Sequence, residues 1–267
     1  MKVSVILPTY YERDNIGDLL NSIESVLCKE SWETEILVVD DNSTDGTAVI
    51  VREHHAISPI EVQCHVRTSE RGLATAILYG IRKSAGDIIV VMDTDFNHDP
   101  AMIPQMVKFL EFYDLVIGSR FVMGGGMEDR QRYYYSLLYN LFIRMLLRLQ
   151  VQDNLSGFFA IRRQRLFAFN LDEIFNGYGE YFIRLLHAAR YQKYRMLEVP
   201  VFYILRRHGK SKSRFLRMLK DYTLCAFSLF WRGIRGPSLI MNKEEFTRRW
   251  KTLSNNQITR EPHDHHL

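Results

Sequence analysis

Residues 88–98 read IIVVMDTDFNH, an apolar run that ends in two carboxylates, an asparagine and a histidine. The β-branched run predicts a buried strand over residues 87–92. Similar short runs alternate with helical patterns through the first half of the chain, which is typical of βαβ units on a mostly parallel sheet. We therefore predict an α/β fold, with strands at 3–7, 35–39, 60–66, 87–92 and 115–118 and helices at 15–27, 44–54, 73–84 and 100–112.

Two of these helices carry start signals. Residues 42–45 (Asn-Ser-Thr-Asp) supply N-cap chemistry for the helix at 44–54, and Pro100 after Asp99 fits the first turn of the helix at 100–112. After residue 118 the pattern changes to a glycine loop at 124–126, an aromatic helix from about Tyr133, a strand near 158–162, a helix near 181–191, a strand at 196–203, a basic loop and a helix over 215–230. We predict one domain over 1–235, with halves 1–118 and 119–235, and a C-terminal tail at 236–267.

Composition restricts the class of protein. The chain has 267 residues, 46% hydrophobic and 25% charged, with a formal net charge of +4. Disordered and collagen-like chains are excluded by these values. The three cysteines form no CxxC pair, so neither a disulfide framework nor a structural zinc site is predicted, and a reducing intracellular setting is the default.

No segment is expected to be a signal peptide or to cross a membrane. The first apolar run, 3–7, ends at Pro8 and is too short for a signal-peptide core. The apolar stretches at 133–143 and 222–231 fall well short of the ~20 residues that span a bilayer.

The acidic turn at 93–97 is a candidate metal site. Ligands of open α/β sheets bind beyond the carboxyl ends of strands, where Asp93 and Asp95, helped by Asn97, could hold Mg²⁺ or Mn²⁺. Alternatively, the acidic pair only ends a strand and caps the next helix. His98 is expected to be a local hydrogen-bonding residue.

Two further strand ends carry polar groups. Asp40 and Asp41 follow the strand at 35–39, and Pro8 to Glu12 follow the first strand, so the three ends would line one crevice. Carboxylates there can accept hydrogen bonds from a base or a ribose, and Tyr10 offers a stacking face, although each group alone is also ordinary turn chemistry. Neither GxxxxGK[ST] nor GxGxxG is present, which argues against a P-loop NTPase and a dinucleotide-binding dehydrogenase.

Seven segments, in their order and spacing, resemble family-2 glycosyltransferases of the dolichyl-phosphate mannose synthase type, in the form without transmembrane helices. They are VSVILPTYYERDNI (3–16), EILVVDDNSTDGT (35–47), ERGLATAILYGI (70–81), AGDIIVVMDTDFNHDP (85–100), DLVIGSRFVMGGG (114–126), DNLSGFFAIRR (153–163) and HGKSKSRF (208–215). The resemblance covers residues 3–220. It implies a GT-A fold and the inverting transfer of a hexose from a nucleotide sugar to a polyprenyl phosphate, with Mg²⁺ or Mn²⁺ as cofactor. In that scheme residues 1–118 bind the nucleotide, and 119–235 face the acceptor and the membrane.

The resemblance also assigns residues on the donor side. The family's nucleotide-binding segment and its base and ribose contacts correspond to Pro8, Tyr10, Glu12, Val39 and Asp41. Its DAD motif and the neighbouring metal-assisting residue correspond to Asp93, Thr94, Asp95 and Asn97.

Cationic and acceptor-side residues follow from the later motifs. Arg120 matches the family's GSR arginine, and Arg132 and Ser136 match its RxxxS acceptor pair. Arg206 and Lys212 match the RxxGxSK loop. A lysine that these synthases usually carry before a helix is missing at 177–181, where this chain reads GYGEY, so the sugar and the acceptor stay open.

Basic and aromatic residues indicate a partner surface. Eleven Lys/Arg and one acid lie between Arg184 and Lys220, which fits either a solvated face or a helix in the headgroup layer of a membrane. The helix from Tyr133, apolar nearly all round, is either core or, as we favour, interfacial. No nucleic-acid-binding module is recognised.

We therefore predict a metal-dependent, inverting hexosyltransferase, with GDP-mannose as donor and a polyprenyl or dolichyl monophosphate as acceptor, bound peripherally to the cytoplasmic face of a membrane. One alternative is another donor, such as UDP-glucose, or a hydroxyl-bearing glycan acceptor. The processive subclass is disfavoured because residues 246–250 read FTRRW and lack the glutamine of QxxRW. A catalytically silent, lipid-binding partner is the third reading. A membrane-anchoring subunit, the oligomeric state and the source stay open.

Overall fold

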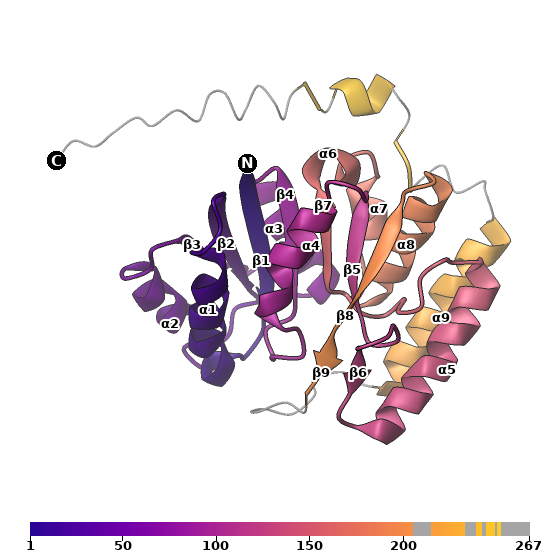
Figure 1. The fold of residues 1–267 in the computed structure, drawn as a ribbon, viewed down its shortest axis with the longest axis horizontal. Helices are drawn as coiled ribbons and strands as arrows, with labels where there is room; N and C mark the ends of the chain where they lie inside the picture. Colours follow the sequence, from indigo (N-terminus) through magenta and orange to yellow (C-terminus); the bar gives the residue numbers. More distant parts are fainter. Residues whose placement is uncertain (205–214, 233–238, 242–243, 249, 252–267) are drawn as a thin grey trace.

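Figure 1 shows the computed structural model, which describes residues 1–204, 215–232, 239–241, 244–248 and 250–251. Within these residues the centre is a seven-stranded sheet with the order β3-β2-β1-β4-β7-β5-β8. β7 is antiparallel to β4 and β5, and the other neighbouring strands are parallel, so the predicted α/β fold is confirmed. The strands are β1 (Lys2–Thr9), β2 (Glu33–Asp40), β3 (Glu61–Val66), β4 (Ile88–Val91), β5 (Leu115–Ser119), β7 (Phe159–Arg162) and β8 (Met196–Pro200).

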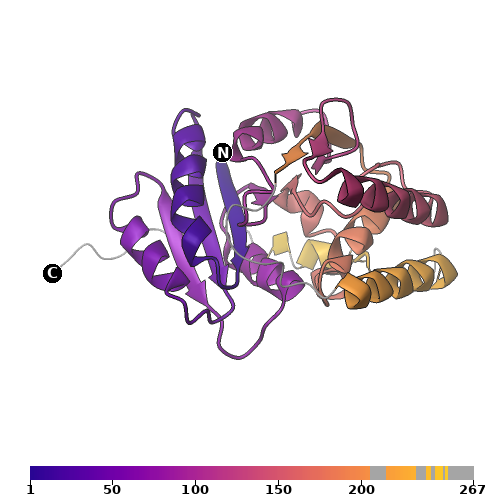
Figure 2. The ribbon, with the colours of Figure 1, turned by 90° about the horizontal axis from the view of Figure 1, so that it is seen from below.

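Helices cover both faces of the sheet, as Figures 1 and 2 show. The alternation of side chains along β1 explains this arrangement: Val3, Val5 and Leu7 pack with α1 (Arg13–Leu27) and α4 (Ile103–Phe109) on one face. Ile6 packs on the other face with α3 (Leu73–Lys83) and α8 (Glu180–Tyr191). Two apolar cores therefore hold the sheet between them and leave the carboxyl ends of its strands open for a site.

The remaining elements extend this framework. A two-stranded parallel sheet pairs β6 with β9. The other elements are α2 (Thr47–His55), the 3₁₀ helix η1 (Pro100–Met102), β6 (Gly126–Met127), α5 (Arg130–Leu147), α6 (Arg163–Leu166), α7 (Leu171–Ile174), β9 (Phe202–Tyr203) and α9 (Phe215–Arg232).

The helix predicted at 44–54 begins later than expected, at Thr47. The chain first reverses through Asn42 and Gly46, which have φ of +59° and +97°. Asp45 then accepts hydrogen bonds from the backbone N–H and the hydroxyl of Thr47. The predicted N-cap position was therefore wrong, because a turn occupies residues 42–46. By contrast, Asp99 caps η1 by accepting a hydrogen bond from Ala101 N, as predicted.

The strand predicted at 196–203 is two strands. Residues up to Pro200 pair with β5, whereas Phe202 and Tyr203 pair with Gly126 and Met127 in the smaller sheet. Val201 joins the two sheets, because its N–H donates to Ser119 O at 2.9 Å and its carbonyl accepts from Gly126 N at 3.1 Å.

Part of the predicted tail contacts the domain. Leu239 and Met241 are buried, and Ile240 forms an antiparallel bridge with Phe169. Asn170 N also donates a hydrogen bond to the carbonyl of Leu239. The predicted division into 1–235 and 236–267 otherwise stays a prediction.

α5 and α9 lie side by side at one edge of the molecule (Figures 1 and 2), and the hydroxyls of Tyr139 and Thr223 are 2.9 Å apart between them. Their inner positions are buried, for example Ile143 and Ala226. Their outer positions expose an apolar surface, here called the α5/α9 apolar surface: Tyr134, Tyr135, Leu138, Leu141, Phe142, Met145, Leu224, Phe227, Phe230 and Trp231. Across the described ranges, no helix is both long and apolar enough to cross a membrane.

Candidate active site

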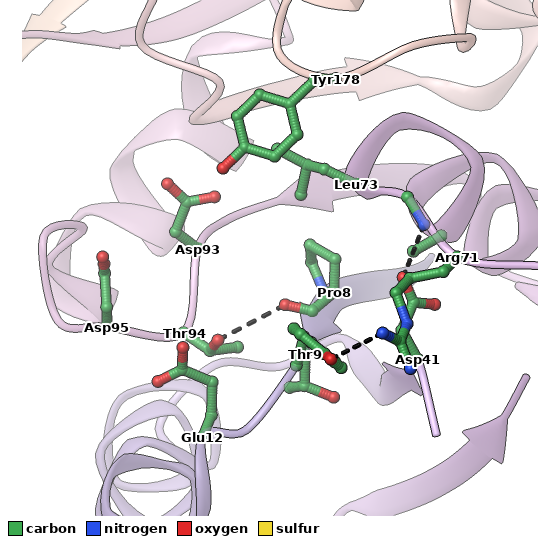
Figure 3. Close-up of a pocket in the computed structure, with 13 residues that line it drawn as sticks. Pro8, Thr9, Glu12, Asp41, Arg71, Leu73, Asp93, Thr94, Asp95 and Tyr178 are labelled. Carbon is green, nitrogen blue, oxygen red and sulfur yellow. Dashed lines mark hydrogen bonds between the residues drawn. The ribbon is translucent and has the colours of Figure 1, made fainter. Parts of the chain in front are cut away.

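The carboxyl ends of β1, β2 and β4 meet at a pocket of about 340 Å³. This is the edge at which open α/β sheets bind their ligands. Figure 3 shows that the three strand ends which the sequence singled out all reach it. Seven of the predicted residues line the pocket: Pro8, Tyr10, Glu12, Asp41, Asp93, Thr94 and Asp95.

The acidic turn after β4 forms one end of the pocket. Asp95 is buried, and its carboxylate accepts hydrogen bonds from the backbone N–H of Asn97 at 3.2 Å and from its amide at 2.7 Å. The side chain of Asp93 is 41% exposed and points toward the hydroxyl of Tyr178 (Figure 3). Phe96, between the acidic pair and His98, has a φ of +62°. The turn therefore holds two carboxylates close together at the pocket wall.

The donor set of this turn fits a hard divalent cation that shares its coordination with a substrate. Mg²⁺ is usually bound by one or two carboxylates together with substrate phosphates and waters. In the part of the chain that the structure describes, no group of three or more His, Cys, Asp or Glu side chains could hold a metal without such help. Asp93 and Asp95 supply the two carboxylates beside an open pocket, and the amide of Asn97 lies next to them.

The opposite end of the pocket is built around Asp41. Arg67, at the end of β3, donates to Asp41 Oδ1 from Nε at 2.7 Å and also from Nη2, while Gly72 N donates to Oδ2 at 2.8 Å. Arg67 further donates from Nη1 to Thr75 Oγ1 on α3. The pair fixes the carboxylate at the pocket wall and joins the ends of β2 and β3 to the start of α3.

Arg71 lines the same end of the pocket and was not predicted. Its Nη1 donates to the hydroxyl of Tyr10 at 2.7 Å, and its guanidinium lies 4.4 Å from the centre of the Tyr10 ring. Thr9 and Tyr178 also line the pocket without having been predicted. The signal for Arg71 was a basic residue two positions before the helix that starts with Leu73.

Glu12 and Thr94 hold the segment after β1. The Glu12 carboxylate accepts a hydrogen bond from the Asn15 side-chain amide at 2.8 Å. The backbone N–H of Glu12 donates to Thr47 Oγ1. Thr94 donates from its hydroxyl to the carbonyl of Pro8 at 3.4 Å, which ties this segment to the acidic turn (Figure 3).

Val39 is not among the residues that line the pocket, and its base contact stays a prediction. Its side chain is fully buried, and its Cγ2 would lie 3.3 Å from a Cβ built on Gly80 of α3. Val39 lies inside β2, where its side chain packs against α3, whereas Asp41 follows the end of the strand.

Arg120 is buried behind the pocket rather than exposed in it. Its Nε and Nη2 donate to the two carboxylate oxygens of Asp153 at 2.7 and 2.6 Å, and its guanidinium lies 4.7 Å from the centre of the Tyr203 ring. Burial alone lowers the pKa of Arg120, but the charge and hydrogen bonds of Asp153 raise it above its ordinary value. Arg120 is therefore already paired with a carboxylate before it could contact a phosphate, as the sequence predicted it to do.

The acceptor-side pair lies on α5. Arg132 is in the first turn, capped by Asp129, and the Asn140 amide donates to the carbonyl of Ser136 at 2.8 Å. Asn140 Oδ1 accepts in turn from Asn154 N at 2.6 Å, next to Asp153. This places Ser136 in a polar network that leads to Arg120. Arg206 and Lys212 lie outside the described residues.

His98 occupies the buried space behind the acidic turn. Its Nδ1 accepts from Asp93 N at 2.8 Å, and its Nε2 is 2.7 Å from the hydroxyl of Tyr203. Burial lowers the pKa of His98 to about 4, so the ring is neutral at pH 7.

The turn that carries Tyr178 rests on α9. Gly179 lies so close to Tyr222 that an added Cβ would be 1.8 Å from the Tyr222 hydroxyl, and Tyr178 N donates to Glu180 Oε2 at 3.1 Å. At residues 177–181, where the expected lysine is missing, the chain therefore brings Tyr178 to the pocket and buries Glu180 beneath it.

Known proteins resemble this chain in sequence and in fold. The family described as "Glycosyl transferase family 2" matches residues 4–168. A dolichol-phosphate mannosyltransferase of Pyrococcus furiosus is 36% identical over 219 residues, which cover 79% of this chain but 59% of that relative. An undecaprenyl-phosphate mannosyltransferase of Micrococcus luteus is 35% identical over 88% of this chain and 98% of its own length.

Solved structures show the same fold. Glucosyl-3-phosphoglycerate synthase from Mycobacterium tuberculosis, in complex with Mn²⁺, UDP and glucosyl-3-phosphoglycerate, has a TM-score of 0.65 at 20% identity, covering 85% of this chain and 79% of that one. A complex of that synthase with Mg²⁺ and UDP has a TM-score of 0.64. At this identity the likeness concerns the fold alone.

Proposed function

Because this chain belongs to glycosyl transferase family 2, we propose that it transfers a hexose, with inversion, from a nucleotide sugar to a polyprenyl or dolichyl monophosphate. The proposed donor is GDP-mannose. The names of the Pyrococcus and Micrococcus relatives support the acceptor class and the sugar.

The observation that carries the proposal is the pocket at the strand ends. Asp93 and Asp95 lie at one end of it, and Asp41 and Arg71 at the other (Figure 3), where Arg71 is bonded to Tyr10. A nucleotide sugar has a base and ribose at one end and a diphosphate at the other, so it suits a pocket with this polarity. Tyr10 offers a ring face to the base, and Asp41 and Glu12 offer acceptors to its N–H groups or to the ribose hydroxyls.

The acidic turn is the proposed cation site. Asp93, Asp95 and Asn97 would hold Mg²⁺ or Mn²⁺, which supplies positive charge to the leaving diphosphate. The bound Mn²⁺ and Mg²⁺ of the Mycobacterium synthase complexes, which share the fold, support a divalent cofactor.

Cationic side chains of this chain have the second role. A phosphate acceptor is already anionic at neutral pH, so it attacks without a general base but needs its charge offset beside the leaving diphosphate. We propose Arg120, Arg206 and Lys212 for this task, with Arg132 and Ser136 positioning the acceptor. The charge of Arg120 is already balanced by Asp153, and Arg71 lies at the other end of the pocket, beside the proposed base contact Tyr10.

The α5/α9 apolar surface is the proposed membrane contact. Ten large apolar side chains are exposed on these two helices, and Arg132 and Ser136 lie on α5 itself. A helix pair with an apolar outer surface can enter the headgroup layer, which would bring a lipid phosphate to the acceptor side. We propose a peripheral position on the cytoplasmic face of a membrane.

The test is sugar transfer with matched acceptors. The purified chain, in liposomes with Mn²⁺, is given labelled GDP-mannose or UDP-glucose together with either polyprenyl phosphate or the corresponding polyprenol. We expect organic-phase label only with GDP-mannose and the phosphate. Label from UDP-glucose would show that GDP-mannose is not the specific donor, and label on the polyprenol would show that the acceptor is a hydroxyl group. If the chain binds nucleotide but forms no labelled lipid, the proposal for the chain alone is overturned.

A further inference from the structure

The backbone of the acidic turn leaves the central sheet just before the proposed cation ligands. The N–H of Met92 donates to Ile6 O at 3.3 Å, and the next N–H, of Asp93, donates to His98 Nδ1 at 2.8 Å. The turn also contains Phe96 with a φ of +62°, a region that costs a non-glycine residue about 1 kcal/mol. Such a conformation persists only where neighbouring contacts fix it.

The hydrogen bonds decide the tautomer of His98. Because Nδ1 accepts the N–H of Asp93, the ring proton lies on Nε2, which donates to the hydroxyl of Tyr203. Tyr203 then donates to the carbonyl of Ser156 at 3.2 Å. Both nitrogens are thus used, and the distance of 3.9 Å from Nε2 to Asp93 Oδ2 is too long for a further hydrogen bond.

Packing holds the ring in this orientation. His98 is fully buried and stacks on Phe158, with ring centres 4.8 Å apart and planes 13° apart. Because both ring nitrogens are bonded and one face is stacked, the ring has one orientation. A displacement of Asp93 N is therefore transmitted to the Tyr203 hydroxyl, and the reverse also holds.

Tyr203 belongs to the part of the fold from which the acceptor-side helix starts. It lies in β9, which pairs with β6, and its carbonyl accepts from Glu128 N at 2.9 Å, two residues before α5 begins. His98 is therefore a direct link between the acidic turn and the small sheet that leads into α5.

We propose that His98 is a positioning residue: its Nδ1 fixes the backbone of the acidic turn for the cation, and its Nε2 fixes that turn relative to the β6/β9 sheet and α5. This inference rests on the proposed function, because the cation and the acceptor are those of the proposed transfer. Residues that orient metal ligands affect metal affinity about 10- to 100-fold when they are removed.

Two substitutions separate the two hydrogen bonds. In His98→Asn the amide oxygen takes the position of Nδ1, so the bond from Asp93 is kept and the bond to Tyr203 is lost. In His98→Gln the amide reaches the position of Nε2, so the opposite bond is kept. Tyr203→Phe removes only the hydroxyl and retains the ring beneath Arg120.

The first readout is Mn²⁺ binding, measured from the electron paramagnetic resonance signal of free Mn²⁺ with GDP and, in parallel, with UDP. We expect His98→Gln to weaken Mn²⁺ binding about tenfold, and His98→Asn and Tyr203→Phe to bind within about twofold of the wild type. The second readout is turnover at saturating Mn²⁺, which we expect to fall about tenfold in His98→Asn and Tyr203→Phe, in parallel.

His54→Gln is the matched control, because His54 is another buried histidine, bonded to Glu24 at 2.7 Å and remote from the pocket residues. Because the glutamine amide can keep the bond that Nε2 makes to Glu24, this variant should change neither readout. If folded His98→Gln binds Mn²⁺ like the wild type, or if Tyr203→Phe turns over like the wild type, the inference is wrong. A wild type that binds Mn²⁺ and nucleotide but transfers no sugar would instead overturn the proposed function, and a wild type that binds neither would overturn both.

Discussion

At the residue scale, the carboxylates of the pocket have different surroundings. Asp41 has its charge matched by Arg67, and its second oxygen accepts from Gly72. Asp93 and Asp95 share one turn, where a divalent cation would offset the repulsion between them. Asp41 is therefore suited to hydrogen bonding with the donor, and the acidic turn to the cation.

Replacement of Asp95 tests the cation assignment. Asp95→Ala removes a carboxylate that the turn holds through Asn97, so we expect transfer to fall by about 10³-fold, in line with the loss of a main electrostatic contact in a transition state. Circular dichroism and thermal unfolding check the fold, and Asp18→Ala, an exposed acid on α1, is the control. Undiminished turnover of Asp95→Ala would contradict the assignment.

The Arg120–Asp153 pair predicts a stability effect. Arg120→Met leaves the fully buried Asp153 carboxylate without its counter-charge, and we expect unfolding to become easier by about 3 to 5 kcal/mol in urea titrations. Asp153→Leu in the same chain should recover part of this loss, because no buried charge then remains. Equal stability of the single and double variants would show that the pair is not coupled.

At the element scale, α5 and α9 join two tasks. Their inner positions complete the core, while their outer positions form the α5/α9 apolar surface. α9 also supports the pocket, because Tyr222 packs against the turn that carries Tyr178.

Charged substitutions on the α5/α9 apolar surface test the membrane contact. Leu138→Glu with Phe227→Glu replaces two exposed apolar side chains, each contributing about 1.5 to 3 kcal/mol when buried in a membrane, so liposome binding should fall more than tenfold. Transfer to a short-chain, water-soluble phosphate acceptor should stay unchanged. Phe112→Glu, at an aromatic residue that is 60% exposed after α4, is the control, and an equal loss with that variant would argue against a specific surface.

Gly179 sets the fit between α9 and the pocket turn. Gly179→Ala places a Cβ 1.8 Å from the Tyr222 hydroxyl, and we expect a loss of about 1 to 3 kcal/mol in stability together with weaker donor binding. Tyr222→Phe in the same chain should restore part of both, because it removes the clashing oxygen.

Gly17→Ala is the comparison within α1. Its Cβ would meet Ile50 at an ordinary 3.5 Å, so the helix should gain rather than lose stability. A Gly179→Ala variant as stable as Gly17→Ala would show that the contact with α9 is loose. Denaturant titration and nucleotide-binding calorimetry measure the two effects.

At the scale of the whole molecule, the sheet determines where the pocket lies. Parallel strands bring their carboxyl ends together, so segments more than 30 residues apart in the chain meet at one pocket. The antiparallel β7 inserts between β4 and β5 and brings the loop with Asp153 and Asn154 next to Arg120. Helix α5, which carries the residues proposed to position the acceptor, starts from the smaller sheet beside it.

Local signals explain what the sequence could predict. β-branched runs located the strands, and carboxylates directly after them located the pocket, because both depend on neighbours in the chain. Contacts between distant segments could not be read in this way: Asp153 lies 33 residues from Arg120, and Arg67 lies 26 residues from Asp41.

The measurement that tests the central claim most directly is the structure of the product. Lipid formed from GDP-mannose and polyprenyl phosphate with Mn²⁺ is analysed by mass spectrometry and by the anomeric signals in nuclear magnetic resonance. Since the sugar is α-linked in GDP-mannose, inverting transfer to the phosphate predicts the acceptor mass plus one hexose, joined as a β-mannosyl phosphate. An α-linked product, a hexose on a hydroxyl group, or free mannose alone would contradict it.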